Sequence, residues 1–177
     1  MTFSVLVTGG TRSGKSIFAE KYAKRLSNSP VYIATAEEFD VEMKNRIARH
    51  KARRGVNWKT VNEPLHIAEA LNDTDGQGAS VVDCLTMWLN NLIMANLSID
   101  ISVEKLIEAI AKRRDPVILV TNEVGSGIVP DNALARSFRD QAGTMNQKIA
   151  RAVDELYFCV SGISLRVKPE IETTHKK

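Results

Sequence analysis

Short apolar runs alternate with longer amphipathic stretches along the whole chain. Five runs rich in valine, isoleucine and leucine have the length of buried strands, and they cover residues 3–8, 31–35, 79–83, 116–121 and 156–160. Apolar residues recur at helical spacing between them, over residues 17–26, 85–97, 103–112 and 131–152, and shorter helices are predicted after Asp40 and after Pro64. A further short run, residues 163–167, closes the pattern. Strands that alternate with helices predict one α/β domain with a mainly parallel sheet and helices on both faces.

The first predicted strand leads into a glycine-rich loop and then a helix. The loop has the pattern Gly-x-x-x-x-Gly-Lys-Ser and consists of Gly9, Gly10, Thr11, Arg12, Ser13, Gly14, Lys15 and Ser16. In this pattern backbone N–H groups surround phosphate oxygens, the lysine reaches the β and γ phosphates, and the serine binds magnesium. A glycine-rich turn without a ligand is the structural alternative. The strand before the loop and the helix after it favour nucleotide binding.

Composition limits the class of protein. The chain has 177 residues, 44% hydrophobic and 25% charged, which suits a single domain over residues 1–168 and a polar tail over 169–177. No apolar run approaches the roughly 20 residues of a membrane helix, and we expect a cytoplasmic protein. The net charge of +3 gives no argument for a nucleic-acid partner. Cys84 and Cys159 lack metal-ligand spacing and are expected to be buried thiols.

Asp83 ends the third predicted strand. A carboxylate there resembles the acid with which phosphate-loop enzymes hold Mg²⁺, opposite the hydroxyl of Ser16. An aspartate in this place can instead cap the helix that follows. The sequence alone does not distinguish a metal-binding Asp83 from a helix-capping one.

A basic segment follows the second predicted strand. Within it Met43, Ile47 and His50 share one face of a helix. A histidine on an apolar helical face is by default a packing residue. The basic side chains suit a solvated surface, nonspecific nucleic-acid binding or a clamp on nucleotide phosphates, and they are Lys44, Arg46, Arg49, Lys51, Arg53 and Arg54.

The fourth predicted strand runs into a loop, residues 122–130, that contains Glu123, two glycines and a proline. Polar groups after a buried parallel strand belong at the edge of the sheet where ligands bind. The loop is either shaped for a substrate or a purely structural turn.

Several segments together resemble one family, the bifunctional adenosylcobinamide kinase/adenosylcobinamide-phosphate guanylyltransferases of cobalamin biosynthesis. The resemblance runs nearly from end to end. It is carried by residues 8–16, 32–36, 46–51, 58–60, 120–130, 138–143, 146–147 and 160–163.

The resemblance implies a RecA-like phosphate-loop fold with two activities. The enzyme phosphorylates adenosylcobinamide with ATP or GTP, then transfers GMP from GTP to adenosylcobinamide-phosphate, with Mg²⁺, through a histidine that corresponds to His50. It implies a homo-oligomer and suggests a trimer. Lys15 serves catalysis, and the implied GTP-binding set adds to the phosphate loop Thr35, Ala36, Glu37, Lys51, Ala52, Arg53, Arg54 and Asp83.

One position departs from the family pattern. The family has a glutamate after its Trp-x-Thr segment, whereas alignment without gaps puts Asn62 there, with Glu63 next. The contact to guanine or ribose therefore falls on either residue. A phosphate-loop kinase for another small molecule, without guanylyl transfer, is one alternative function; it would need Lys15, Ser16 and Asp83 but would never label His50. A nucleotide-dependent binding or regulatory module that uses the basic segment on nucleic acid is the other.

Overall fold

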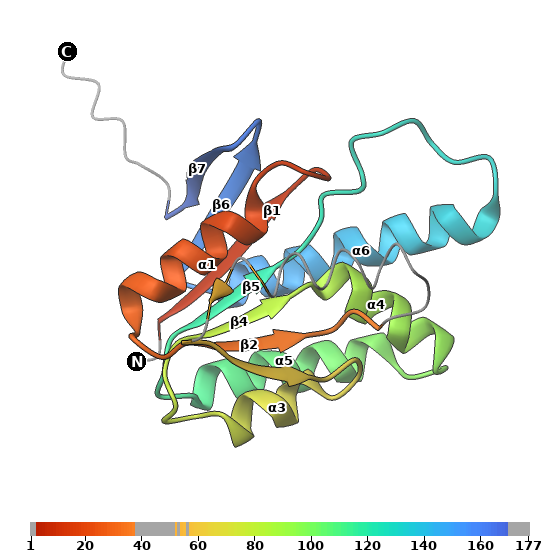
Figure 1. Cartoon of the computed structure of the whole chain (residues 1–177). Coiled ribbons are helices and arrows are strands. Elements are labelled where there is room, and N and C mark those ends of the chain that lie inside the picture. Colours follow the sequence, from red (N-terminus) through yellow and green to blue (C-terminus); the bar gives the residue numbers. More distant parts are fainter. Residues whose placement is uncertain (1–2, 38–51, 53, 56, 170–177) are drawn as a thin grey trace, which may run out of the picture.

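The computed structural model describes residues 3–37, 52, 54, 55 and 57–169, and its described strands form one seven-stranded sheet (Figure 1). The strand order is β3-β2-β4-β5-β1-β6-β7, and every pairing is parallel except that of β6 with β7. The strands are β1 (Ser4–Gly9), β2 (Val31–Ala34), β3 (Lys59–Asn62), β4 (Ser80–Asp83), β5 (Val117–Val120), β6 (Glu155–Val160) and β7 (Ile163–Lys168). The helices are α1 (Lys15–Leu26), α3 (Ile67–Asp73), α4 (Leu85–Met94), α5 (Ile99–Lys112) and α6 (Ala133–Ala152).

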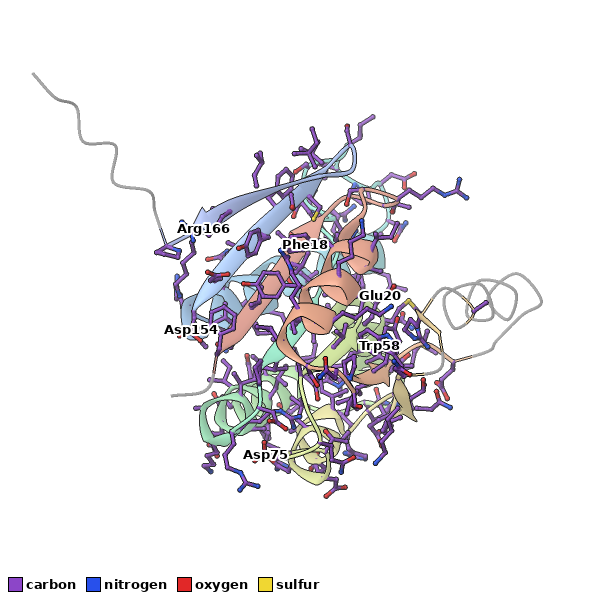
Figure 2. The ribbon with its side chains drawn as sticks, turned by 60° about the vertical axis from the view of Figure 1, so that its left-hand side comes forward. Phe18, Glu20, Trp58, Asp75, Asp154 and Arg166 are labelled. Carbon is purple, nitrogen blue, oxygen red and sulfur yellow. The ribbon has the colours of Figure 1, made fainter. Side chains whose placement is uncertain are left out.

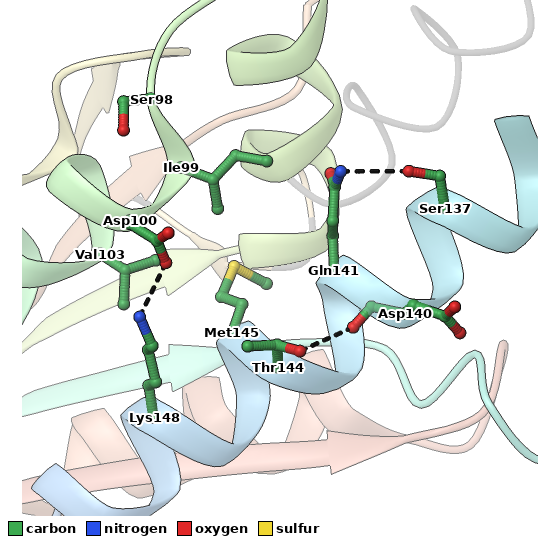
Figure 3. Close-up of a pocket in the computed structure, with 10 residues that line it drawn as sticks. All are labelled: Ser98, Ile99, Asp100, Val103, Ser137, Asp140, Gln141, Thr144, Met145 and Lys148. Carbon is green, nitrogen blue, oxygen red and sulfur yellow. Dashed lines mark hydrogen bonds and ion pairs between the residues drawn. The ribbon is translucent and has the colours of Figure 1, made fainter.

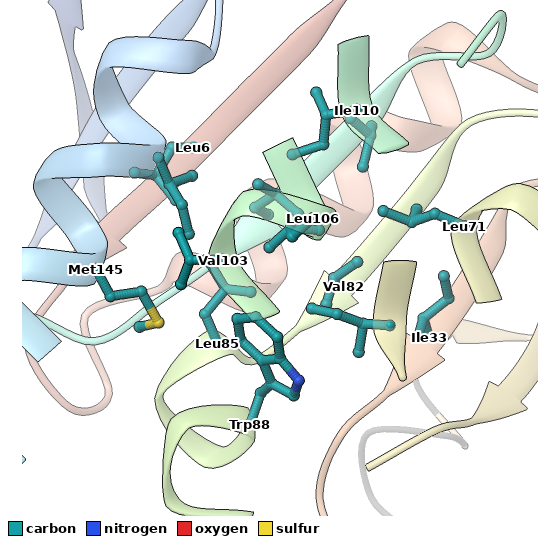
Figure 4. Packing of buried hydrophobic residues seen from close by; sticks show 14 of the residues in the cluster. Leu6, Ile33, Leu71, Val82, Leu85, Trp88, Val103, Leu106, Ile110 and Met145 are labelled. Atoms are coloured by element: carbon teal, nitrogen blue, oxygen red, sulfur yellow. The ribbon is translucent and has the colours of Figure 1, made fainter. Parts of the chain in front are cut away.

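Alternation along the central strands divides the core into two layers. Val5 and Val7 of β1 face α1, whereas Leu6 faces the opposite layer, formed by α3, α4, α5 and α6. Figure 4 shows that larger layer, where Trp88 is 1% exposed and packs among aliphatic side chains. Apolar residues on both faces of each central strand explain why those strands are nearly continuous hydrophobic runs.

The strand order brings the loops of interest to one edge of the sheet. β5 lies between β4, which ends in Asp83, and β1, which leads into the phosphate loop. Because parallel strands have their carboxyl ends at a common edge, the chain after β5 emerges between those two features. The α/β fold with a mainly parallel sheet and helices on both faces, predicted above, is confirmed.

The element boundaries refine the prediction. α5 begins at Ile99, four residues before the predicted start, because the Ser98 side chain caps it by accepting a hydrogen bond from the N–H of Ile101. The run over residues 163–167 is the antiparallel strand β7, joined to β6 by Ser161 and Gly162, both at positive φ, as a tight hairpin requires. The edge strand β3 was not predicted.

Some predictions lie outside the described residues. They are the helix after Asp40, the role of His50, the contacts of Lys51 and Arg53, and the extent of the tail beyond residue 169. The division into a domain over residues 1–168 and a tail over 169–177 stays a prediction. None of the helices in the described part of the chain is long and apolar enough to cross a membrane.

Candidate active site

The predicted phosphate loop lies between β1 and α1, with Lys15 as the first residue of the helix. Gly14 precedes the helix at φ 98°, in a region that favours glycine. The Lys15 Nζ donates to the carbonyl oxygen of Gly10 at 2.5 Å and lies 3.5 Å from the Ser13 Oγ. The ammonium is therefore held against its own loop, and Lys15 as a whole is 7% exposed. It lies at the N-terminal end of a helix, a position that favours anions.

The hairpin of β6 and β7 supports this loop. Gly162 N donates to the Ser13 carbonyl oxygen at 3.1 Å, and the carbonyl oxygen of Cys159 lies against Gly9. On the other side the N–H of Glu123 donates to the Gly9 carbonyl oxygen at 3.0 Å. Two segments that carried the family resemblance, 120–130 and 160–163, thus hold the phosphate loop in place.

Gly9→Ala is expected to destabilise the fold by about 2–4 kcal/mol. A Cβ at this position would lie 2.2 Å from the carbonyl oxygen of Cys159, and φ is +146°. Gly10→Ala is the matched control, because its Cβ would meet nothing within 4 Å, and it should change stability by less than about 0.5 kcal/mol. Urea unfolding of both variants measures the difference, and equal stabilities would contradict the close approach.

Asp83 ends β4 with its carboxylate held by a neighbouring strand. The Tyr32 hydroxyl donates to Asp83 Oδ2 at 2.9 Å. Burial raises the pKa of the Tyr32 phenol well above its usual range, the Asp83 carboxylate raises it further and the Arg54 guanidinium lowers it, so the phenol remains a hydrogen-bond donor at neutral pH. The side chain of Asp83 is therefore a fixed acceptor at the carboxyl end of the strand.

Polar side chains secure the chain between Asp83 and the phosphate loop. The Thr86 Oγ1, in the first turn of α4, accepts from the N–H of Asn122 at 2.8 Å and lies 3.3 Å from the Thr121 Oγ1. Thr121 Oγ1 donates to Asn146 Oδ1 of α6 at 2.8 Å. This network fixes the start of the loop over residues 122–130. The Glu123 Oε1 accepts from Gly125 N and Ser126 Oγ within that loop.

The predicted residues after β2 have different surroundings. Thr35 is fully buried, and its hydroxyl donates to the carbonyl oxygen of Cys84 and accepts from Cys84 N, both at 2.8 Å. Ala36 is half-buried and Glu37 is exposed. Thr35 thus fastens β2 to β4, whereas Glu37 is accessible to a ligand.

Arg54 lies on the same face of the sheet as Asp83. Its guanidinium carbon is 3.5 Å from the centroid of the Tyr32 ring, and the side chain is 5% exposed. Trp58 meets the same ring edge-on, with centroids 6.1 Å apart. Figure 2 shows Trp58 and Glu20 of α1 on this face of the molecule. Ala52, by contrast, is exposed.

The end of β3 distinguishes Asn62 from Glu63. Asn62 pairs with Ala34 in the register of β2 and is exposed. The Glu63 Oε1 accepts from the N–H groups of Leu65 and His66, at 3.0 and 2.8 Å, immediately before α3. Glu63 therefore caps the chain entering that helix, and Asn62 has the side chain open to a ligand.

Both cysteines are free thiols, as predicted, but only Cys159 is buried, whereas Cys84 is half-buried. Burial, with the Asp83 carboxylate beside it, raises the pKa of the Cys84 thiol to about 11, although the Lys15 ammonium acts in the opposite direction. The same lysine acts on Cys159, whose pKa is raised by burial. The Lys15 ammonium therefore acts on groups at the ends of both β4 and β6.

A separate hollow of about 590 Å³ lies between the start of α5 and the middle of α6 (Figure 3). An ion pair between Asp100 and Lys148, 2.7 Å apart, crosses one side of it. Asp140 and Gln141, which belong to a segment that carried the family resemblance, line the other side. Among the described residues, none of those predicted to bind nucleotide lines this hollow.

Comparison with known proteins gives a family. A model of the family described as cobinamide kinase / cobinamide phosphate guanyltransferase matches residues 5–167. The bifunctional adenosylcobalamin biosynthesis protein CobP of Pseudomonas aeruginosa is 40% identical over 168 residues, covering 93% of this chain and 97% of that protein. The corresponding CobU proteins of Salmonella typhimurium and Escherichia coli are 40% and 38% identical, and each match covers 93% of this chain and 99% of that protein.

Solved structures share the fold at low sequence identity. The P4 protein from bacteriophage phi6, in complex with ADP, superposes with a TM-score of 0.51 at 16% identity, covering 92% of this chain and 52% of that one. A prototypical ATPase from the type III secretion system of pathogenic bacteria gives a TM-score of 0.52 at 10% identity, covering 88% and 50%. These likenesses identify the fold as that of RecA-like phosphate-loop ATPases.

Proposed function

The chain belongs to the family of cobinamide kinases and cobinamide phosphate guanylyltransferases, and we infer that it carries out both reactions in adenosylcobalamin biosynthesis. It phosphorylates adenosylcobinamide with ATP or GTP and then transfers GMP from GTP to the new phosphate, giving adenosylcobinamide-GDP. The observation that carries this function is a complete phosphate loop on the sheet edge where Asp83 ends β4.

In the kinase step, the hydroxyl oxygen of the aminopropanol group forms a bond to the γ phosphorus. The bond between that phosphorus and the β–γ bridging oxygen breaks, the nucleoside diphosphate leaves and the hydroxyl proton passes to solvent. The transition state needs in-line positioning and neutralisation of charge rather than covalent help from the protein. Lys15 and the N–H groups of the loop supply both.

The residues present fit a magnesium ion. Among the described residues there is no group of three or more histidine, cysteine or acidic side chains that would enclose a metal. Mg²⁺ does not require one, because it usually takes one or two protein ligands, phosphate oxygens and water. Ser16 and Asp83 would hold it, and when bound it neutralises charge on the β and γ phosphates.

For guanylyl transfer we assign the nucleophile to His50, which lies outside the described residues. A neutral imidazole nitrogen bonds to the α phosphorus while pyrophosphate leaves, and a phosphate oxygen of adenosylcobinamide-phosphate then displaces the histidine. Arg54 follows His50 by four positions in the chain, a stretch that spans at most about 14 Å. Since Arg54 is held over Tyr32 beside Asp83, this tether supports the assignment.

Beyond the phosphate loop, the nucleotide site is assigned to Thr35, Ala36, Glu37, Lys51, Ala52, Arg53, Arg54, Asn62 and Asp83, whether by direct contact or by supporting a contact residue. Exposure favours Glu37 and Asn62 for direct contact to the base or ribose. Buried Thr35 and Arg54 instead shape the site through β4 and Tyr32. The homo-oligomer, its trimeric form and the cytoplasmic location stay predictions.

Asn62→Ala is expected to raise the KM for GTP in guanylyl transfer about three- to tenfold with little change in stability, as loss of one hydrogen bond to substrate would. Glu63→Ala should do the reverse, lowering the free energy of unfolding by about 1 kcal/mol through loss of its cap while leaving that KM unchanged. Steady-state kinetics and urea unfolding of the pair separate the two roles. A larger KM effect at Glu63 would transfer the nucleotide contact to that residue.

The direct test of the function is a reaction of the purified protein with Mg²⁺ and GTP labelled at the α phosphate. We expect acid-labile label on the protein after denaturation, and its release onto added adenosylcobinamide-phosphate. A protein that phosphorylates adenosylcobinamide but never carries label would be a kinase alone.

A further inference from the structure

Tyr32 connects the predicted metal-binding carboxylate of Asp83 with Arg54 and Trp58, which lie just before β3 in the chain. β2 pairs with β4 so that Ala34 lies opposite Asp83, which puts Tyr32 diagonally across from the carboxylate on the α1 face. Its hydroxyl donates to Oδ2 at 2.9 Å. The carboxylate therefore cannot turn freely about its side-chain bonds.

The ring that carries this hydroxyl is itself fixed on two sides. The Arg54 guanidinium covers one face, with its central carbon 3.5 Å from the ring centroid, and Trp58 packs edge-on at 79° between ring planes. Tyr32, Arg54 and Trp58 are 4%, 5% and 9% exposed. A cation over the ring face draws electron density from the phenol and strengthens its hydroxyl as a donor.

Arg54 has more bonding capacity than the described contacts use. Its Nε is buried without a hydrogen-bond partner among the described residues, although the guanidinium is a strong donor. Its carbonyl oxygen accepts from the Lys24 Nζ of α1 at 3.2 Å, which anchors the backbone at this point. The contact of Arg54 with Tyr32 is thus built into the packing between α1 and β2.

We propose that Tyr32 is a positioning residue for the metal site: its hydroxyl orients the Asp83 carboxylate toward the nucleotide-bound cation, and the stacked Arg54 guanidinium sets the strength of that orientation. The inference rests on the proposed metal role of Asp83. It adds to the site a side chain that touches neither nucleotide nor corrinoid. A ligand acting on Arg54 would change cation binding at Asp83 through Tyr32, and the reverse coupling would have equal size.

Binding of Mn²⁺, followed by its electron paramagnetic resonance signal in the presence of a GTP analogue with a β,γ-imido bridge, tests this role without turnover. Tyr32→Phe keeps the ring and removes only the hydroxyl, and should weaken Mn²⁺ binding about tenfold or more, the equivalent of one hydrogen bond to a charged group. Binding of the analogue without metal should not change. In the kinase assay kcat should fall and recover at high Mg²⁺, while the KM for adenosylcobinamide stays constant.

Tyr22→Phe is the matched control. The Tyr22 hydroxyl also donates to a carboxylate, Glu155 Oε2 at 2.8 Å, on the same side of the sheet but away from Asp83. Tyr22→Phe should therefore leave Mn²⁺ binding unchanged. If Tyr32→Phe lowers thermal stability as Tyr22→Phe does but binds Mn²⁺ like wild type, the bond to Asp83 is purely structural and the proposal is wrong.

Two further variants separate the parts of the argument. Asp83→Asn should weaken Mn²⁺ binding more than Tyr32→Phe does; wild-type binding in Asp83→Asn would refute the metal assignment itself, independently of Tyr32. Arg54→Met should weaken binding about twofold in the wild-type background and not at all in Tyr32→Phe, because the two residues act in series. An undiminished Arg54 effect in the absence of the hydroxyl would show that Arg54 acts on the nucleotide directly and would overturn its part in the proposal.

Discussion

Lys15→Met abolishes both phosphoryl and guanylyl transfer in our expectation, with a loss of at least about 10³-fold in kcat/KM for each. In the phosphate-loop pattern this lysine is the residue that reaches the β and γ phosphates, and we expect both reactions to need it there. In the kinase step it stabilises the transferred phosphoryl group. In guanylyl transfer it stabilises the leaving pyrophosphate, so a single substitution removes both.

Lys21→Met is the control for Lys15→Met. Lys21 is exposed on the same helix, so its replacement changes the net charge equally without touching the loop. It should leave both rates within about twofold of wild type. Thermal unfolding must accompany the kinetics, because Lys15 is buried and donates to the Gly10 carbonyl oxygen. A folded Lys15→Met protein that kept guanylyl transfer would show that the loop serves the kinase step only.

The parts of this site that follow from local pattern were predictable. The phosphate loop depends on residues close in sequence, and the apolar run before it and the helical spacing after it indicated the strand and helix that the structure has. Asp83 was predicted in the same way, from its place after a buried run. No local segment of the sequence determines the strand order that puts the phosphate loop and Asp83 on either side of β5.

Contacts between distant segments explain what the sequence did not reveal. A tyrosine within an apolar run is typical of a packed strand, and the partner of the Tyr32 hydroxyl lies 51 residues further along the chain. Arg54 was interpreted with its basic neighbours, although its charge is stacked on an aromatic ring. The strand β3 was not predicted because it lacks an apolar run. Lys59, Thr60 and Asn62 are exposed at the edge of the sheet, and Val61 is the single apolar residue of the strand.

Asn62, at the end of the edge strand β3, and Glu63, directly after it, have different surroundings. A family glutamate can be matched to either residue by sequence, and only the hydrogen bonds show that the Glu63 carboxylate serves the backbone before α3. These hydrogen bonds affect which of the two side chains can turn toward a ligand. A carboxylate with two backbone donors is costly to redirect toward a ligand, whereas the exposed amide of Asn62 has no such commitment among the described contacts.

His50→Ala should eliminate guanylyl transfer while leaving the kinase reaction within about threefold of wild type. The two reactions break different bonds of the nucleotide, and only the one at the α phosphorus requires a nucleophile from the protein. With GTP labelled at the α phosphate, we expect protein-bound label to fall at least about 10³-fold. Kinase activity is measured separately, as phosphate transfer from ATP labelled at the γ position to adenosylcobinamide.

His66→Ala provides the comparison for His50→Ala, because His66 is an exposed histidine at the start of α3 whose backbone, not its ring, makes the described hydrogen bond. It should retain full labelling and both rates. Label that persisted in His50→Ala and disappeared in His66→Ala would move the nucleophile to the α3 side of the molecule. Equal loss of both activities in a folded His50→Ala protein would instead mean that this histidine supports nucleotide binding, because a residue needed only at the α phosphorus has no part in transfer of the γ phosphate.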